Sequence, residues 1–443
     1  MSKLYTASIR FLLIIFLLLA SFESNYAIPS FTRQTGVACS DCHTTFPMLN
    51  AFGRQFKLNA YTMITAESLE SKDKQGQSML LQKSFPLSAL IQTSYTHISK
   101  TLPGTQNDYF ALPQQMSLFL AGEITPKVGA FMQITYSQVD GAIGMDNTEI
   151  RYADNTTIAD SKLDYGLTLN NNPGVSDLWH TLPAWGFPYA SSAITPGALS
   201  QTLLEGGLAG KSIGLGVYGL WNNWIYGEIA PYRSAFQGKA QPFDATVAGV
   251  IKGLAPYWRL AVQHPFGDHY ISVGAFGLMA NTIPSGISGP ADNYSDIGGD
   301  LQYEYTFGKS TLALYGSYIM ENQKLNRLSA DSINPMTMNI SNTLNSMRFT
   351  ATYSYNCMFS ASLGYFSLKG SADSTLYSGG SLNWKPDTGG IIAEIACFPW
   401  MNTRFSLQYY MFNSFNGASA NYDGSNRDAS HNNTIHLLAW IMF

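Results

Sequence analysis

The sequence predicts an all-β protein, a transmembrane antiparallel β-barrel of about 16 strands preceded by a small, mainly helical N-terminal segment. Only 12% of the 443 residues are charged, about half of the ~25% that is usual for soluble domains, whereas 13% are aromatic. Long stretches also alternate between apolar and polar residues with a period of two, as strands do between lipid and a polar lumen. A large soluble β protein is the alternative on composition alone.

The first 27 residues have the features of a secretory signal peptide. Lys3 and Arg10 supply positive charge, residues 11–20 form an apolar run, and Ala27 is a candidate cleavage residue. The run is shorter than the roughly 20 residues of a membrane-spanning helix, and no later run reaches that length. We therefore expect an exported protein that crosses a membrane as a closed barrel. The net charge of −4 gives no case for nucleic-acid binding.

The alternation identifies individual strands and the face that meets lipid. The last strand places apolar residues on one face and ends in an aromatic residue, Phe443, as the barrels of bacterial outer membranes do. The expected lipid-facing residues are Met116, Leu118, Leu120, Ile124; Val128, Ala130, Met132, Ile134, Tyr136; Phe349, Ala351, Tyr353, Tyr355; Phe405, Leu407, Tyr409, Met411; and Ile435, Leu437, Ala439, Ile441 and Phe443.

Short and long connections alternate along the chain. Short turns are expected at 125–127, 154–161, 221–224, 265–269, 307–309, 355–358 and 398–403. Long loops are expected at 100–113, 138–146, 171–200, 235–255, 281–293, 322–341, 370–387 and 414–433. Short periplasmic turns and long outer loops are typical of a bacterial barrel. Eight hairpins give about 16 strands, provided that residues 201–221 form one long strand.

One motif carries chemistry: residues 39–43 read Cys-Ser-Asp-Cys-His, the C-x-x-C-H pattern that attaches a c-type haem. Two thiols add to the vinyl groups of the haem, and the adjacent imidazole reaches the iron. Cys39 and Cys42 are thus the expected attachment points of one covalently bound haem c, and His43 is the expected axial ligand. The alternatives are a disulfide, a zinc half-site, which wants a second ligand pair, and a thioredoxin-like pair, which wants a βαβ context.

The sixth ligand of the iron is left open by the motif. Met48, Met63 and His97 are candidates, and an open position is the further alternative. The other two cysteines, Cys357 and Cys397, continue the lipid-facing parity of their strands and are expected to behave as small apolar residues.

The haem motif lies in a short segment, residues 28–80. It begins on the periplasmic side, because the first strand, near 85–99, leads outward to the first long loop. A segment of this size has a marginal core by itself, and a barrel of about 16 strands otherwise encloses water. We expect the segment to plug the lumen, giving a signal peptide at 1–27, a monohaem cytochrome c segment at 28–80 and a porin-like barrel at 81–443.

Several stretches of this chain resemble the fused cytochrome–porins, the outer-membrane monohaem cytochromes of iron-oxidising bacteria and their relatives. The resemblance covers nearly the whole mature chain and is carried by residues 31–39, 46–47, 51–59, 146–152, 165–173, 183–189, 415–418 and 437–443. One departure is Ala60, where the family has glycine, which affects local backbone freedom.

The resemblance implies an outer-membrane electron-transfer protein with Fe(II) oxidase activity. Extracellular Fe(II) would be the donor, and a periplasmic carrier such as a soluble cytochrome or a cupredoxin the acceptor. Two alternatives remain: another extracellular donor or acceptor, and a transport porin in which the haem segment is a plug. The lumen-side charges Glu123, Arg348, Glu394 and Arg404 are expected to be ordinary pore lining rather than an iron site.

Overall fold

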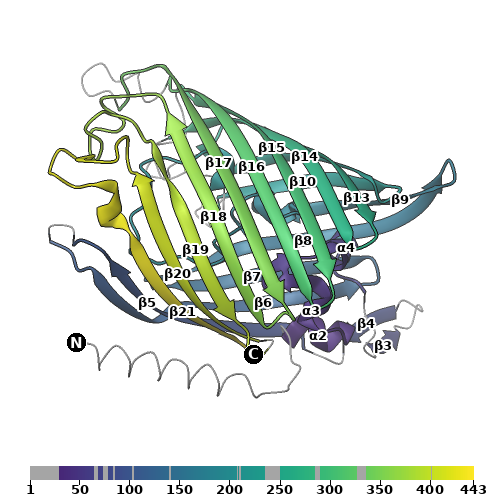
Figure 1. Cartoon of the computed structure of the whole chain (residues 1–443). Coiled ribbons are helices and arrows are strands. Elements are labelled where there is room, and N and C mark those ends of the chain that lie inside the picture. Colours follow the sequence, from purple (N-terminus) through teal and green to yellow (C-terminus); the bar gives the residue numbers. More distant parts are fainter. Residues whose placement is uncertain are drawn as a thin grey trace, which may run out of the picture.

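The computed structural model describes residues 29–443 except 64–67, 73–77, 83–84, 102–103, 139–140, 207, 209–210, 235–249, 285–289, 327–335 and 401. The predicted signal peptide therefore lies outside the described residues. Most of the described chain forms one closed antiparallel β-barrel, with small helices at one end (Figure 1).

Seventeen labelled strands form the barrel. Because β12 and β13 both pair with β14 and are two parts of one strand, the barrel has sixteen strands. This confirms the predicted number. In chain order they are β5 (Leu87–Ile98), β6 (Asp108–Thr125), β7 (Val128–Ser137), β8 (Ala142–Ile158), β9 (Ser161–Asn170), β10 (Ser212–Trp221), β11 (Ile225–Ser234), β12 (Val250–Ile251), β13 (Ala255–Phe266), β14 (His269–Ile283), β15 (Asp292–Phe307), β16 (Ser310–Lys324), β17 (Ser341–Tyr355), β18 (Phe359–Gly370), β19 (Thr388–Cys397), β20 (Thr403–Ser414) and β21 (Thr434–Met442).

The first and last strands close the barrel. Strand β21 pairs antiparallel with β5, from Thr434 opposite Ile98 to Met442 opposite Leu90 (Figure 1). Each of the seven predicted short turns contains a break between consecutive strands, and the breaks after β6, β8, β13 and β15 are only two residues long. Because the strand number is even, the chain enters and leaves the barrel at the end that carries the short turns.

The prediction of one strand over 201–221 is wrong. Strand β10 begins only at Ser212, and a 3₁₀ turn, η1 (Leu203–Glu205), precedes it. Leu204 and Leu208 are buried in an apolar cluster inside the barrel instead of facing lipid. The strand count is unchanged, because residues 171–211, here called the inner loop, form a single connection that includes α5 (Pro173–Ser176).

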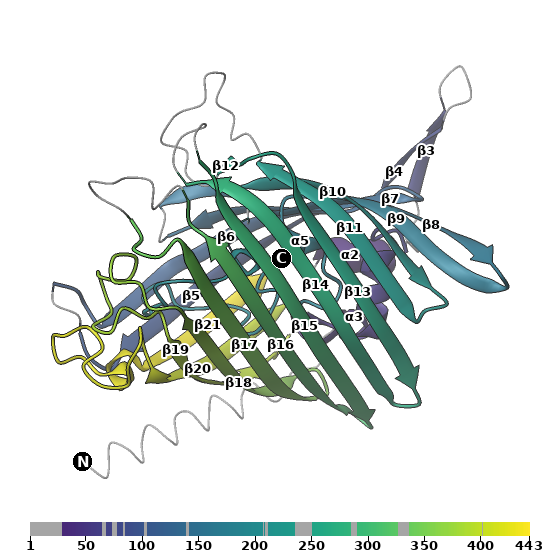
Figure 2. The ribbon, with the colours of Figure 1, turned by 90° about the horizontal axis from the view of Figure 1, so that it is seen from above.

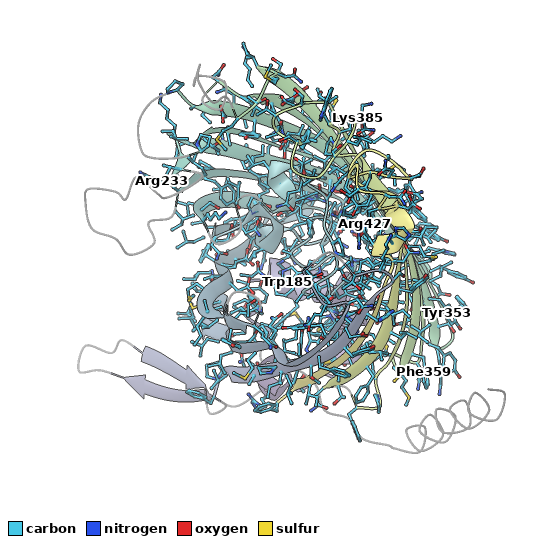
Figure 3. The ribbon with its side chains drawn as sticks, turned by 90° about the vertical axis from the view of Figure 1, so that its left-hand side faces the viewer. Trp185, Arg233, Tyr353, Phe359, Lys385 and Arg427 are labelled. Atoms are coloured by element: carbon cyan, nitrogen blue, oxygen red, sulfur yellow. The ribbon has the colours of Figure 1, made fainter. Side chains whose placement is uncertain are left out.

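The two faces of the wall differ as the alternation predicts. In β17, Phe349, Tyr353 and Tyr355 are exposed on the outside, whereas Thr352 and Ser354 are buried. Figure 3 shows Tyr353 and Phe359 on the outer side of the ring of strands and Trp185 in its interior. An apolar exterior around a polar interior is the reverse of a soluble barrel and is typical of a bacterial outer-membrane barrel, so the protein resides in the outer membrane among its lipids. Within the described ranges, the helices are all too short or too polar to cross a membrane.

The N-terminal segment, defined here as residues 29–63, precedes the barrel. It contains α2 (Pro29–Thr35), α3 (Cys39–Cys42), β1 (His43–Thr45), β2 (Met48–Leu49) and α4 (Ala51–Leu58), and its helices lie at the short-turn end of the barrel (Figures 1 and 2). A hairpin of β3 (Ser68–Lys72) and β4 (Ser78–Gln82) then projects away from the barrel (Figure 2). The expected domain limit at 80/81 falls within β4, and the barrel begins at β5.

Candidate functional site

Polar side chains bind the N-terminal segment to the inner face of the barrel. Arg54 on α4 forms an ion pair with Glu304 on β15, with 2.7 Å between Nη1 and Oε1, and both side chains are almost fully buried. The Tyr61 hydroxyl donates to Glu149 on β8 at 2.7 Å. On the other side of the barrel, the Ser354 hydroxyl donates to the carbonyl oxygen of Thr44 at 2.9 Å. Strands far apart in the ring therefore hold the same segment.

The backbone of the segment also approaches the wall closely. The Tyr218 hydroxyl on β10 donates to the Leu58 carbonyl at 2.8 Å, and Arg404 on β20 donates to the Phe46 carbonyl at 3.1 Å. A Cβ atom at Gly129 on β7 would lie only 1.9 Å from the carbonyl oxygen of Ala60. A glycine is thus required at this contact, because any larger residue would displace the backbone of the segment.

The inner loop folds into the lumen rather than outward. Gln302 on β15 donates to the Trp179 carbonyl at 2.6 Å, and Gln408 on β20 donates to the Ala190 carbonyl at 2.9 Å. Lys57 of the N-terminal segment links the two elements, since its ammonium group donates to the carbonyl oxygens of Val175 (2.6 Å) and Asp177 (2.9 Å). The loop and the segment therefore meet inside the barrel.

The C-x-x-C-H motif lies where these two elements meet. Cys39 and Cys42 are the two ends of α3, and His43 follows at the start of β1. Asn50 fixes α3 against α4, because its backbone N–H donates to the Cys42 carbonyl at 2.9 Å and its side chain accepts from Gly53 at 3.0 Å. A Cβ atom at Gly53 would lie 2.2 Å from the Cys42 carbonyl oxygen, so glycine permits this close packing.

The His43 ring is oriented by a backbone hydrogen bond. Its Nδ1 lies 3.0 Å from the carbonyl oxygen of Pro47, to which a protonated Nδ1 donates, and this leaves Nε2 as the free nitrogen. Histidines that bind metals commonly have such a bond from the second nitrogen to a carbonyl. The ring also packs against Phe46, with 4.8 Å between the ring centroids.

A cavity opens beside the motif. It contains about 1100 Å³ of empty space, including the part open to solvent, and Cys39, Cys42 and His43 all line it. Six large aromatic side chains from the segment, the wall and the inner loop are part of the lining: Phe46, Phe56, Phe119, Phe131, Trp185 and Trp440. Two thiols, one imidazole and an apolar surround are the donor set and environment that a c-type haem requires.

Burial determines the charge of the titratable groups near the cavity. Desolvation lowers the pKa of His43 to about 4, so its imidazole is neutral near pH 7. Desolvation also lowers the pKa of Lys57 to about 8. Burial, followed by the proximity of Cys39 and Asp41, raises the pKa of Cys42 to about 12. A thiol that stays protonated is a poor nucleophile for disulfide exchange, which disfavours the thioredoxin-like alternative.

The three candidates for the sixth ligand are not brought to this cavity. His97 lies on the outer side of β5, where its Nδ1 is 2.9 Å from Asp108 Oδ1, and it is nine residues, or about 30 Å, along the strand from Ser88, which lines the cavity. Met63 is 39% exposed. Met48 lines a second, adjoining pocket, where its sulfur accepts from the Tyr189 hydroxyl at 3.8 Å.

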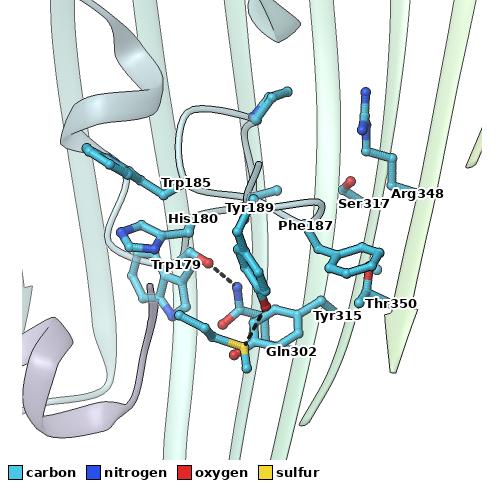
Figure 4. A pocket seen from close by; sticks show the side chains of 15 residues that line it. Trp179, His180, Trp185, Phe187, Tyr189, Gln302, Tyr315, Ser317, Arg348 and Thr350 are labelled. Atoms are coloured by element: carbon cyan, nitrogen blue, oxygen red, sulfur yellow. Dashed lines mark hydrogen bonds between the residues drawn. The ribbon is translucent and has the colours of Figure 1, made fainter. Parts of the chain in front are cut away.

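That second pocket shares His180 and Trp185 with the first. Figure 4 shows His180 beside Trp179 and Trp185, facing the pocket from the inner loop. Desolvation, followed by the proximity of Lys57, lowers the pKa of His180 well below its usual value. No local sequence pattern marks His180, because its position depends on the inward folding of a long loop, where the sequence predicts an outer loop.

The lumen-side charges are mostly engaged in ion pairs. Arg404 Nη2 lies 2.6 Å from Glu394 Oε1 across neighbouring strands, and Arg348 Nε lies 2.8 Å from Glu205 Oε1 of the inner loop. Glu123 lies at the end of β6, where its backbone N–H donates to Gln34 at 3.3 Å.

The two remaining cysteines are free thiols, and one is not where the parity placed it. Cys397 lies on the outer side of β19, as expected. Cys357 lies in the turn after β17, where Asn356 and Cys357 both adopt a positive φ of 52°. The tight turn ends the alternation at Tyr355, so the lipid-facing prediction for Cys357 is wrong.

No model of a protein family and no curated protein matches this sequence. Solved barrels are similar in fold at low identity. The anion-selective porin of Comamonas acidovorans is 12% identical with a TM-score of 0.45, over 85% of this chain and 99% of that one. DcaP, an outer membrane channel of Acinetobacter baumannii, is 11% identical with a TM-score of 0.46, over 81% and 96%. OmpF of Salmonella typhi, solved with daunomycin, is 13% identical with a TM-score of 0.44, over 85% and 100%. These values carry no information on what this chain binds.

Proposed function

We propose that this outer-membrane barrel is a c-type cytochrome that transfers electrons across the outer membrane. The observation that carries the proposal is the C-x-x-C-H motif at the wall of a large aromatic cavity inside the barrel. Cys39 and Cys42 would hold the haem covalently, and Nε2 of His43 would bind the iron. When bound, the haem would supply a one-electron carrier between an extracellular donor and an oxidised periplasmic carrier.

The residues around the cavity have defined tasks in this proposal. Pro47 keeps the His43 ring oriented through the bond to Nδ1. Phe46, Trp185 and Trp440 exclude water from the porphyrin, and a dry, low-dielectric surround is one of the means by which a protein sets a haem potential. Arg54 and Lys57 hold the motif at a fixed position in the lumen.

The donor we propose is Fe(II), in line with the resemblance of the sequence to cytochromes of iron oxidisers. The test is stopped-flow absorbance of the purified oxidised protein mixed with Fe(II), at acidic and at neutral pH. We expect rapid haem reduction that is absent in a His43→Ala variant. If dithionite reduces the haem and Fe(II) does not at either pH, another donor or an outward electron flow becomes the account.

The porin-like barrel favours a second candidate, solute transport with the N-terminal segment as a plug. In that case the barrel would conduct ions in planar lipid bilayers, and a Cys39→Ser/Cys42→Ser variant without covalent haem would conduct equally well. Under the electron-transfer proposal we expect low conductance, because the segment and the inner loop cross the lumen and bind strands on several sides.

A further inference from the structure

The cavity beside Cys39 and Cys42 has a second imidazole in its wall. The chain contains seven histidines, and within the described residues the cavity is lined by two of them, His43 from the N-terminal segment and His180 from the inner loop. The two residues are 137 positions apart in sequence (180 − 43). Only the inward folding of the loop brings His180 to the motif.

The His180 ring is partly buried and lacks a hydrogen-bond partner among the described residues. Its Nδ1 is buried without a hydrogen-bond partner, and within the described chain no partner is found for Nε2 either. The ring packs against Trp185, with 6.2 Å between the ring centroids. Buried polar groups in folded proteins are rarely left without a partner, so this unpaired nitrogen in the wall of the cavity is suited to bind a ligand there.

The flanking residues hold His180 in place through an extensive network. The buried Asp177 carboxylate accepts hydrogen bonds from the backbone N–H groups of Trp179 (3.0 Å) and Thr181 (2.7 Å), on either side of His180. The Trp179 indole donates to the Tyr270 hydroxyl at 2.8 Å. His180 itself has a φ of +53°, in the left-handed region that non-glycine residues rarely adopt. The network fixes this conformation, which presents the ring to the cavity.

We propose that His180 is the second axial ligand of the haem iron, together with His43. This inference rests on the proposed function, because it requires the covalent haem. The iron would then connect the N-terminal segment to the inner loop, so the cofactor would fasten the segment inside the barrel. A second imidazole in place of methionine also keeps the reduction potential low, since Met/His ligation raises the potential of cytochromes c.

A sulfur ligand is the competing possibility. Met48 lines only the adjoining pocket and binds Tyr189. Met442, at the end of β21, does line the cavity, and its side chain is 4% exposed. The Met442 thioether is the matched comparison for His180, because both side chains border the same space.

The experiment uses the full-length haem-containing protein, purified in detergent. Covalent haem is measured first by haem staining after denaturing electrophoresis, and barrel folding by the mobility shift on heating. The ligands are then identified by electron paramagnetic resonance and near-infrared magnetic circular dichroism of the ferric protein. For the wild type we expect a low-spin signal with two imidazole ligands and no charge-transfer band of methionine–iron.

Substitutions at His180 should change the ligands without removing the haem. In His180→Ala we expect a high-spin haem that returns to low spin when imidazole is added. In His180→Met we expect a low-spin haem with the methionine–iron band and a higher midpoint potential. Met442→Leu and Met48→Leu should keep the wild-type spectrum.

The outcomes separate the two proposals. If the wild type carries no covalent haem, the proposed function fails and this inference fails with it. If covalent haem is present and His180→Ala keeps the wild-type low-spin spectrum in a folded barrel, the inference is overturned while the proposed function stands. Loss of the low-spin signal in Met442→Leu would also overturn it and assign the ligand to Met442.

Discussion

The buried ion pair between Arg54 and Glu304 gives a quantitative test of how the N-terminal segment is held. We consider Glu304→Gln, which removes the negative charge and keeps the size of the side chain. Removing one partner of a buried pair usually costs about 3–5 kcal/mol, because the other charge stays buried and unpaired. Two contacts of Arg54 remain, one to the Leu49 carbonyl at 2.9 Å and one to the Tyr270 ring at 4.0 Å. We therefore expect the lower end, about 3 kcal/mol.

This cost should appear as faster release of the segment from the wall. At 1.36 kcal/mol per factor of ten, about 3 kcal/mol corresponds to a roughly 150-fold increase in the population of the released state. Hydrogen exchange of the α4 amides, followed by mass spectrometry in detergent micelles, measures that population. The strand amides of β15 serve as the internal reference, because they report on the barrel itself.

Two controls separate the ion pair from other effects. The double variant Arg54→Met/Glu304→Gln should recover most of the protection, since replacing both partners of a buried pair is often near neutral. Lys127→Ala breaks an exposed pair with Asp154 and should cost less than about 1 kcal/mol. The claim that this pair holds the segment would be refuted if the exchange rates of the α4 amides in Glu304→Gln stayed within about threefold of the wild type, which corresponds to about 0.7 kcal/mol.

Four further predictions concern the fit of the segment and the wall. Burial lowers the pKa of Lys57 from 10.5 to about 8, so between these two pH values the unfolded state binds more protons than the folded state. The free energy of unfolding should therefore rise by at most about 3 kcal/mol from pH 8 to 10.5. The urea midpoint measures this rise, and Lys57→Met should remove it. In Gly129→Ala the new Cβ atom would lie 1.9 Å from the Ala60 carbonyl oxygen, which should destabilise the docked segment by about 1–3 kcal/mol. Gly144 has open space around it, so Gly144→Ala should change the opening free energy measured by hydrogen exchange of α4 by less than about 0.5 kcal/mol. Ala60 has a φ of +55° and is fully buried. Ala60→Gly relieves about 1–2 kcal/mol of backbone strain and loses about 0.8 kcal/mol with the buried methyl group, so thermal stability should stay the same or rise. A fall in thermal stability would contradict this expectation. Leu301→Arg on the outer face should cost about 2–4 kcal/mol in refolding into lipid vesicles, if it lies near the midplane.

The sequence determined the features of this protein that depend on local patterns. Strand faces follow from a period of two, so the outward positions of Phe349 or Leu437 were predictable from their neighbours. Turn positions follow from the chemistry of a few adjacent residues. The spacing of Cys39, Cys42 and His43 is also local, which is why the motif can be read without a structure.

The tertiary structure decided the features that depend on distant partners. Residues 201–211 are apolar enough for a strand, but Leu204 and Leu208 find a buried cluster inside the barrel, and burial there competes with lipid contact. The same inward fold places His180 in the wall of the cavity with His43, whereas His97, Met48 and Met63 do not line that cavity. A ligand on a loop more than a hundred residues from the motif cannot be recognised from the neighbouring sequence. Its position depends on tertiary hydrogen bonds, such as those that Asp177 and Gln302 form with the backbone of Trp179, next to His180.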